Sequence, residues 1–338
     1  MNRFGMLMPR DLDEAVAVMG RKDLSLNVLK AGGIDLLDHL KEGLTTPSVL
    51  TNLRHVKDAA LRRVEATSAG ALATLAEIGA SEAIAKSTPA LVHAARAAAT
   101  PQIRNVATIG GNLLQRPRCW YYRNQQFDCL KKGGHTCYAV EGENRYHAFF
   151  GPGPCHIVHP SNLAPALSVC EGTVTTRSAT HPQGGRTLAM ADLFVTPDRN
   201  LKTEHVLEPD EVVVKIEWKP APHSAQYEIR EKQSFDWPLV MVAVALEFEG
   251  ASGRLISSAR VCAGAVAPIP WRLTAVEKAL IGVNVNNDQL LGEVCAKATE
   301  GAAPMTDNSY KIRLLTVATH RAVRLAAGLK IDDPFHLA

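Results

Sequence analysis

The sequence of 338 residues contains no apolar run that approaches the roughly 20 residues needed for a membrane-spanning helix. Its 37 basic and 34 acidic residues are interspersed, so it lacks the clustered positive charge typical of nucleic-acid-binding proteins. The first residues also lack the apolar stretch and cleavage site of a signal peptide. We therefore expect no membrane span, no nucleic-acid partner and a cytoplasmic location, or a periplasmic one if a signal-bearing partner exports a folded complex.

Several motifs that mark catalytic or cofactor sites are also absent. There is no G-x-G-x-x-G run of a Rossmann domain, no G-x-S-x-G turn, no H-E-x-x-H helix and no P-loop lysine. Seven cysteines are present, but an odd number without a signal peptide argues against a disulfide framework. The composition, 46% apolar and 21% charged, is that of a globular protein with a core.

The order of apolar and turn-forming residues predicts an α+β fold. Residues 1–55 follow a β-α-β-α-β pattern. We next expect a helix that begins within 69–77, an alanine-rich helix at 90–99 that Pro101 ends, and a strand-like segment at 103–108. After a linker at 220–223, a separate α+β region is expected, with antiparallel strands at 227–232, 240–248 and 257–264 and helices at 272–280, 287–299 and 310–329.

Two Gly-Gly pairs stand in turns that could hold a phosphate. The first, Ala31-Gly32-Gly33, lies between a short strand and a helix, and the second, Gly110-Gly111-Asn112, follows Thr108, whose hydroxyl is placed to donate. Glycine adopts positive φ and allows backbone N–H groups to approach phosphate oxygens closely. An isolated pair is more often a plain turn, because glycine marks turns throughout proteins.

The sequence around these turns resembles the FAD-binding subunit of the xanthine dehydrogenase family of molybdenum hydroxylases. The matching landmarks are, in order, Ala31-Gly32-Gly33-Ile34-Asp35-Leu36, Gln102-Ile103-Arg104-Asn105-Val106-Ala107-Thr108-Ile109-Gly110-Gly111-Asn112-Leu113, His159-Pro160-Ser161-Asn162-Leu163-Ala164-Pro165-Ala166, Gly264-Ala265-Val266-Ala267-Pro268-Ile269-Pro270-Trp271-Arg272 and Tyr310-Lys311-Ile312-Arg313-Leu314. The resemblance covers nearly the whole chain. It implies a two-subdomain FAD-binding fold of the vanillyl-alcohol-oxidase/PCMH type at 1–219, divided near residue 55, followed by a smaller α+β C-terminal domain at 223–332.

The same resemblance implies where FAD binds. The first turn would wrap the pyrophosphate with Leu29, Lys30, Ala31, Gly32, Gly33, Ile34, Asp35 and Leu36. The remaining cofactor-binding residues would be Thr108, Gly111 and Asn112 at the phosphate and ribitol, Ser161 and Asn162 near the flavin, and Leu207, Arg230 and Lys232. No side chain of this chain would be catalytic, because the flavin itself mediates electron transfer.

Three positions depart from the family pattern. Ile34 stands where threonine is usual and Asn162 where aspartate is usual. Glu228 occupies the usual lysine position, so Arg230 or Lys232 would have to reach the isoalloxazine, unless this is simply a surface strand with alternating charges. Losing a hydroxyl at position 34 removes about 0.5–1.5 kcal/mol. Losing a carboxylate at position 162 would shift the flavin potential without abolishing binding.

Four of the seven cysteines fall in an irregular insertion at 115–156, with the spacing C-x9-C-x7-C-x17-C: Cys119, Cys129, Cys137 and Cys155. The spacing matches neither a zinc ribbon nor a bacterial ferredoxin, so core thiols, a Cys₄ zinc site and a [4Fe–4S] cluster all stay open. The run that ends in Arg116-Pro117-Arg118-Cys119 resembles the flavin subunit of bacterial aldehyde oxidoreductases. This resemblance implies that the four cysteines hold a [4Fe–4S] cluster.

The expected function is that of an FAD- and [4Fe–4S]-containing electron-transfer subunit in a heterotrimeric aldehyde oxidoreductase. Its partners would be a molybdenum-cofactor large subunit and a [2Fe–2S] small subunit, and electrons would leave to an external acceptor. One alternative is the flavin subunit of a 4-hydroxybenzoyl-CoA-reductase-like enzyme, in which electrons flow towards the molybdenum. Another is a non-catalytic flavin- or zinc-binding scaffold.

Overall fold

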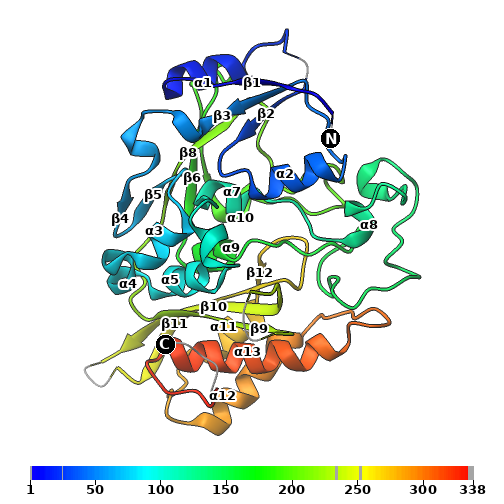
Figure 1. The fold of residues 1–338 in the computed structure, drawn as a ribbon. Coiled ribbons are helices and arrows are strands. Elements are labelled where there is room, and N and C mark those ends of the chain that lie inside the picture. The colour runs from blue at the N-terminus through cyan, green and yellow to red at the C-terminus, as the bar shows by residue number, and fades with distance from the viewer. Residues whose placement is uncertain (1, 25, 233–234, 251–252, 334–338) are drawn as a thin grey trace.

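The computed structural model describes residues 2–24, 26–232, 235–250 and 253–333. Three sheets follow one another along the long axis of the molecule, with the C-terminal helices at the far end (Figure 1). Of the helices in this described part, none combines the length and apolarity required to cross a membrane. The expected α+β fold is confirmed.

The N-terminal unit has the predicted β-α-β-α-β order. Its elements are β1 (Gly5–Leu7), α1 (Leu12–Met19), β2 (Asn27–Lys30), α2 (Ile34–Lys41) and β3 (Val49–Asn52). The three strands are parallel in the order β1-β3-β2. Asp11 caps α1 by accepting a hydrogen bond from the Glu14 amide at 2.8 Å.

The middle unit contains a five-stranded antiparallel sheet in the order β4-β5-β8-β6-β7. Its strands are β4 (Val64–Glu65), β5 (Ser68–Gly70), β6 (Thr173–Arg177), β7 (Thr187–Ala189) and β8 (Val212–Glu217). Its helices are α3 (Leu75–Ala80), α4 (Glu82–Ser87), α5 (Pro89–Ala97), α6 (Pro101–Arg104), α7 (Ile109–Leu113), α9 (Leu163–Val169) and α10 (Met190–Leu193). Between α7 and α9, the irregular insertion carries α8 (Trp120–Arg123).

Two expectations for this middle unit are wrong, and helix-capping chemistry explains them. Residues 103–108 form no strand, because Thr100 caps α6, Pro101 occupies its first turn, and Thr108 caps α7. Pro101 therefore begins a helix instead of ending one. The helix expected to begin within 69–77 is confirmed: it begins at Leu75, after a capping box between Thr74 and Glu77, and residues 69–70 before it belong to β5.

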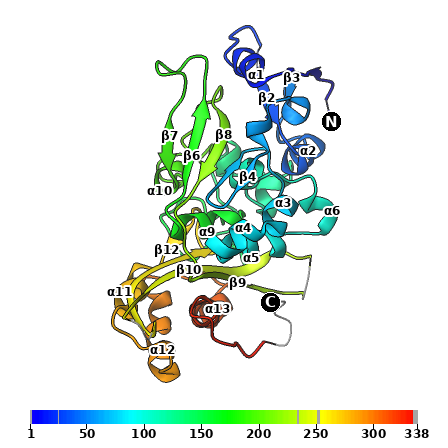
Figure 2. The ribbon, with the colours of Figure 1, turned by 90° about the vertical axis from the view of Figure 1, so that its left-hand side faces the viewer.

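The C-terminal unit is an antiparallel sheet in the order β12-β11-β10-β9 that is covered on both faces. Its elements are β9 (Ser224–Arg230), β10 (Pro238–Glu249), β11 (Leu255–Gly264), β12 (Trp271–Arg272), α11 (Thr274–Leu280), α12 (Asp288–Cys295) and α13 (Tyr310–Ala326). α13 packs on one face, and α5 and α9 pack on the other (Figure 2). Residues 240–246 are therefore all buried, and alternate side chains enter two different cores.

Candidate functional site: a flavin cleft beside a cysteine pocket

The first Gly-Gly turn connects β2 to the start of α2, as expected. Gly33 caps α2 with φ +86°, a conformation that favours glycine. A Cβ on Gly32 would lie 2.1 Å from the carbonyl oxygen of Val106, so this turn lies directly against the segment before the second turn. In the described chain, the amides of Gly33, Ile34 and Asp35 have no hydrogen-bond partner. These are donors that a helix N-terminus offers to an anion.

The second Gly-Gly pair lies inside the first turn of α7 and has its amides already paired. Ile109 and Gly110 donate to the carbonyls of Ala73 and Ala71 at 2.8 and 3.0 Å. The Gly111 amide donates to the Thr108 hydroxyl oxygen at 3.1 Å. The middle unit therefore holds this loop rigidly, and its paired amides are not available to a ligand. The loop can still contact a ligand through its surface and can donate the Thr108 hydroxyl proton.

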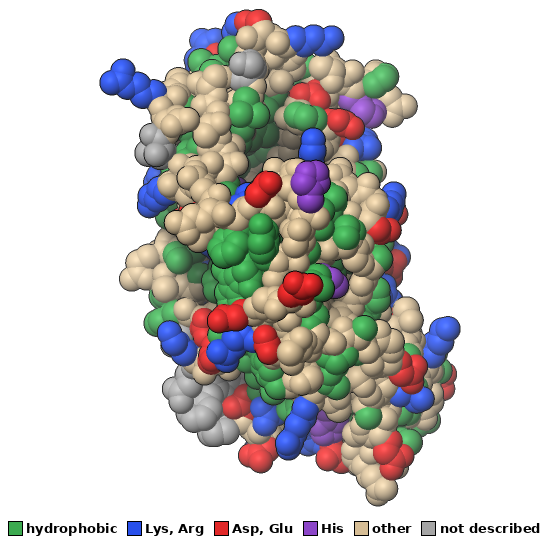
Figure 3. Space-filling model, turned by 90° about the vertical axis from the view of Figure 1, so that its right-hand side faces the viewer, with side chains coloured by type: hydrophobic (Ala, Val, Ile, Leu, Met, Phe, Trp, Pro, Cys, Tyr) green, Lys and Arg blue, Asp and Glu red, His purple; other side chains and the backbone are tan. Residues whose placement is uncertain are grey.

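A cleft with a cavity volume of about 660 Å³ lies between these two turns and extends to the loop that precedes β10. This volume falls within the roughly 300–1,000 Å³ of a typical ligand pocket. The expected FAD residues that line the cleft are Leu29, Ala31, Gly32, Gly33, Ile34, Asp35, Leu36, Thr108, Gly111, Asn112, Asn162 and Leu207. On the face that carries the insertion, hydrophobic side chains gather in the middle of the molecule (Figure 3).

Four expected cofactor residues do not line this cleft. Lys30 and Ser161 lie next to it in sequence, but Lys30 Nζ donates to the Ala31 carbonyl at 3.4 Å, and Ser161 Oγ donates to Asn112 Oδ1 at 2.7 Å. Lys232 is exposed, and its amide donates to Asp236. The Arg230 guanidinium is paired with Glu228 at 2.7 Å and with the Ala97 carbonyl, and it does not line the cleft.

The unusual residues Asn162 and Glu228 are partners of each other. The Asn162 amide donates to Glu228 Oε1 at 2.9 Å, and Arg230 neutralises the other carboxylate oxygen. The carboxylate that is missing at position 162 is thus present on the neighbouring strand, with its side chain 4% exposed. The two departures from the family pattern form one buried arrangement that retains an amide at the cleft wall.

Several cleft residues carry no signal in the sequence. They include Ala98, Ala99, Thr100 and His205, and the loop residues Phe235, Asp236, Trp237 and Pro238. They come from loops and helix ends, and all but the first three are distant from the glycine turns in the chain. Only the three-dimensional arrangement brings them to the ligand space, and no periodicity or motif marks them.

The four cysteines of the insertion line one small pocket. They share it with Tyr121, Tyr122, Leu130, Lys131, Tyr138 and Ile157. Cys119 and Cys129 stand at the starts of short helical turns, and Cys119 Sγ lies 3.2 Å from His147 Nε2. Burial raises the pKa of the Cys119 thiol to about 11, and a hydrogen bond with Cys155 lowers that of Cys137 to about 5.

The described residues contain no group of three or more His, Cys, Asp or Glu side chains that could hold a metal ion. The pocket therefore gathers four sulfur atoms without forming a ready-made centre for a single ion. The other three cysteines, Cys170, Cys262 and Cys295, are buried in the cores, and all seven are free.

A chain of buried charges connects the cleft to the cysteine pocket. Asp35 accepts hydrogen bonds from the Arg116 amide at 2.8 Å and from Arg123 Nη2 at 2.7 Å. Burial opposes ionisation of Asp35, but these two donors lower its pKa overall below the ordinary 3.8. Arg116 and Lys131 both pair with Glu204. The basic residues of the insertion are thus largely internal partners and do not form a solvated face.

Comparisons with known proteins agree with this geometry. Residues 2–218 match the family described as the FAD binding domain in molybdopterin dehydrogenase, and residues 225–326 match the CO dehydrogenase flavoprotein C-terminal domain. The aldehyde oxidoreductase FAD-binding subunit PaoB of Escherichia coli is 33% identical over 84% of this chain and 86% of its own length. The carbon monoxide dehydrogenase medium chain of Afipia carboxidovorans is 26% identical over 94% of both chains.

A solved structure shows the same fold. Quinoline 2-oxidoreductase from Pseudomonas putida 86 superposes with a TM-score of 0.73 at 22% identity, over 97% of this chain and 98% of that one. The chain thus has the fold of a known protein structure. The chain belongs to the family of FAD-binding medium subunits of molybdenum hydroxylases, and it is a subunit of an oxidoreductase.

Proposed function

We propose that this chain binds FAD and one [4Fe–4S] cluster and serves as the electron-transfer subunit of a heterotrimeric aldehyde oxidoreductase. Electrons would enter from molybdenum and [2Fe–2S] centres on partner subunits and leave for an external acceptor. The name of the Escherichia coli relative supports the aldehyde as substrate, which would be oxidised on the molybdenum subunit. The proposal rests mainly on one observation: a flavin-sized cleft lies next to a pocket lined by four cysteines.

The cleft offers FAD both hydrogen-bond donors and an apolar wall. The unpaired amides at the N-terminus of α2 would donate to the pyrophosphate, where the helix dipole favours negative charge. Thr108 is fixed by the Gly111 amide, so its hydroxyl proton is free to donate to the ligand. Bound FAD would supply the capacity to accept and release two electrons. The chain would position it and exclude water with side chains such as Ile34, Leu36 and Leu207.

The cysteine pocket offers what an iron–sulfur cluster requires. A [4Fe–4S] cluster is held by four cysteine thiolates, and here four cysteines from distant positions of the insertion surround one apolar space. Lys131, with its side chain 2% exposed, lies in the wall and is a buried cation near the negative charge of the thiolates. Tyr121, Tyr122 and Ile157 would keep water from the site.

Replacing Cys129 by serine tests the proposal. We expect the Cys129→Ser protein to lose most of its iron and acid-labile sulfide while it keeps its flavin absorbance. Cys295→Ala is the matched control, because Cys295 is buried in the C-terminal core away from the pocket. Unchanged iron in Cys129→Ser would refute the ligand assignment. A colourless, zinc-loaded wild-type chain would refute the cofactors altogether, and reduction of an aroyl-CoA by the purified complex would favour the reductase alternative.

A further inference from the structure

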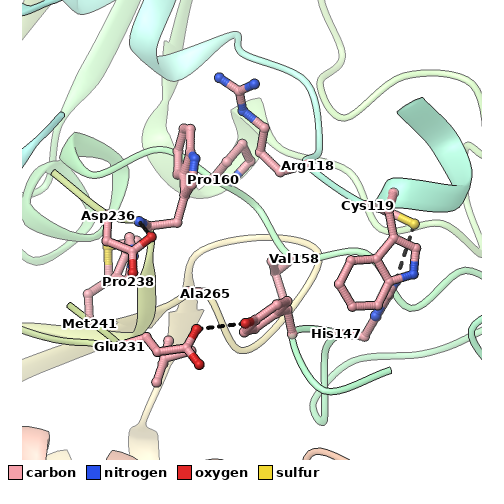
Figure 4. Close-up of a pocket in the computed structure, with 14 residues that line it drawn as sticks. Arg118, Cys119, His147, Val158, Pro160, Glu231, Asp236, Pro238, Met241 and Ala265 are labelled. Carbon is pink, nitrogen blue, oxygen red and sulfur yellow. Dashed lines mark hydrogen bonds between the residues drawn. The ribbon is translucent and has the colours of Figure 1, made fainter. Parts of the chain in front are cut away.

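A second cavity, of about 210 Å³, is shown in Figure 4, and it shares lining residues with both the flavin cleft and the cysteine pocket. It shares Arg118, Asp236, Trp237 and Pro238 with the cleft. It shares Cys119 with the cysteine pocket. The cavity thus adjoins both proposed cofactor sites, and five of its fourteen lining residues come from the insertion.

Three large aromatic side chains, those of Trp120, Tyr146 and Trp237, line this cavity. Trp120 and Tyr146 meet edge to face with ring centroids 5.5 Å apart. The Tyr146 hydroxyl donates to Glu231 at 2.7 Å, which fixes both side chains at one end (Figure 4). Trp237 lies at the side of the flavin cleft, where the Arg118 guanidinium carbon is 4.5 Å from its ring centroid. A flat ring could therefore pack among these aromatic side chains.

One polar donor in the wall is unused. Arg118 Nη1 donates to Asp38 at 3.2 Å, but the buried Nε atom has no hydrogen-bond partner in the described part of the chain. An unpaired buried donor is energetically unfavourable, so a bound acceptor oxygen would stabilise it. Glu231 and Asp236 also line the cavity, and Glu231 pairs with Arg145 as Arg118 pairs with Asp38, so the wall holds no excess positive charge. This balance disfavours an anionic ligand.

We propose that this cavity binds the external electron acceptor, a neutral molecule of the quinone class with one or two rings. The inference rests on the proposed function, in which FAD occupies the adjacent cleft. The volume is below the roughly 300–1,000 Å³ of drug-sized pockets, which excludes a dinucleotide, and the carboxylates would repel its phosphates. A quinone carbonyl oxygen accepts from Arg118 Nε–H while its ring stacks on Trp237.

The reaction balances without a further reagent. The quinone takes up two electrons and two protons, so that its two carbonyl groups become hydroxyl groups, and it leaves as the quinol. Both electrons and both protons come from the reduced FAD, which returns to its oxidised form. Trp120, Tyr146 and Trp237 exclude water during the transfer, and Arg118 orients the ring.

Equilibrium dialysis of the flavin-loaded full chain against duroquinone tests the site. Duroquinone is chosen because its fully methylated ring leaves no carbon open to addition by cysteine thiols. We expect one duroquinone per wild-type chain. Val158→Phe should fill the cavity and weaken binding about tenfold or more, with unchanged flavin content, since Val158 does not line the cleft. Arg118→Lys, which keeps the charge but loses Nε, should weaken binding several-fold.

A matched control and the flavin spectrum separate the possible outcomes. Trp271→Phe lies outside the cavity, on Phe150, and should bind duroquinone like the wild type. Binding to the flavin-free chain that disappears when FAD is added would show that the flavin ring itself fills the cavity and would overturn the inference. So would a flavin-loaded wild type that takes up no duroquinone. A chain that holds no flavin even after incubation with FAD would overturn the proposed function itself.

Discussion

At the scale of single residues, the Glu204 carboxylate has the most demanding environment in the connection between the two sites. Its side chain is 4% exposed, with Arg116 Nε 3.0 Å away and the Lys131 ammonium in contact. Burial opposes its ionisation, but attraction to Arg116 and Lys131 lowers its pKa below the ordinary 4.5. Because the folded pKa is the lower one, its stabilising contribution is complete above pH 4.5 and is lost as the pH falls through the folded pKa.

Glu204→Gln should therefore destabilise the chain by about 3–5 kcal/mol at neutral pH, because two buried cations would lose their counter-charge. Urea unfolding measures this difference, and the free energies of unfolding of wild type and Glu204→Gln should become more similar below pH 4.5. Glu217→Gln is the control, because its partner Lys215 is 47% exposed, and its effect should stay within about 0.5 kcal/mol. An equal effect of the two substitutions would contradict the role given to Glu204.

At the scale of secondary-structure elements, the two glycine turns depend on each other. Gly32 has no room for a side chain, because its Cβ would meet the backbone at Val106. Gly32→Ala should therefore push the first turn away from the second and weaken FAD binding by about tenfold or more, with a loss of roughly 1–3 kcal/mol in stability.

Isothermal titration of the flavin-free chain with FAD, together with urea unfolding, measures both effects of Gly32→Ala. The control is Gly292→Ala on α12, where an added Cβ meets nothing within 4 Å and φ is not in the left-handed region. This control should stabilise the helix slightly, since alanine is the better helix former by about 1 kcal/mol. Unchanged FAD affinity in Gly32→Ala would show that the close contact of the turns does not shape the cleft.

At the scale of the whole molecule, Lys311 connects α13 to the insertion and to the end of β11. Its ammonium donates to the carbonyls of Ala265 at 2.7 Å and His147 at 3.2 Å, and no carboxylate of the described residues pairs with it. Burial lowers its pKa from 10.5 to about 7. Between these two pH values the unfolded chain holds a proton that the folded chain does not, so the free energy of unfolding rises with pH in this window.

Lys311→Met should remove this rise. Urea unfolding of both proteins at pH 7 and at pH 9.5 measures this rise in the free energy of unfolding. All other titrating groups are common to the two proteins, so the difference between wild type and variant isolates the contribution of Lys311. Lys297→Met, at an exposed residue, should leave the pH dependence unchanged. If the free energy of unfolding changed equally with pH in wild type and Lys311→Met, the buried amine would have an ordinary pKa.

Much of the architecture could be predicted from local patterns. The β-α-β-α-β start, the first glycine turn and the long C-terminal helices follow from alternation, caps and positive φ, all of which involve residues close together in the chain. The expected strand at 103–108 does not form, because Thr100, Pro101 and Thr108 favour helix starts more strongly than the β-branched residues of this segment favour a strand.

By itself, the sequence determined the fold, the family and the clustering of four cysteines, because each depends on residue order and short-range conformational preference. Only the tertiary structure decided that Arg230 pairs with Glu228 instead of lining the cleft, and that Asn162 is Glu228's partner. It also placed Trp237 and Arg118 around a cavity that shares lining residues with both sites. Buried charges and cavity walls are set by contacts between distant residues, where the energy of pairing and packing outweighs local preference.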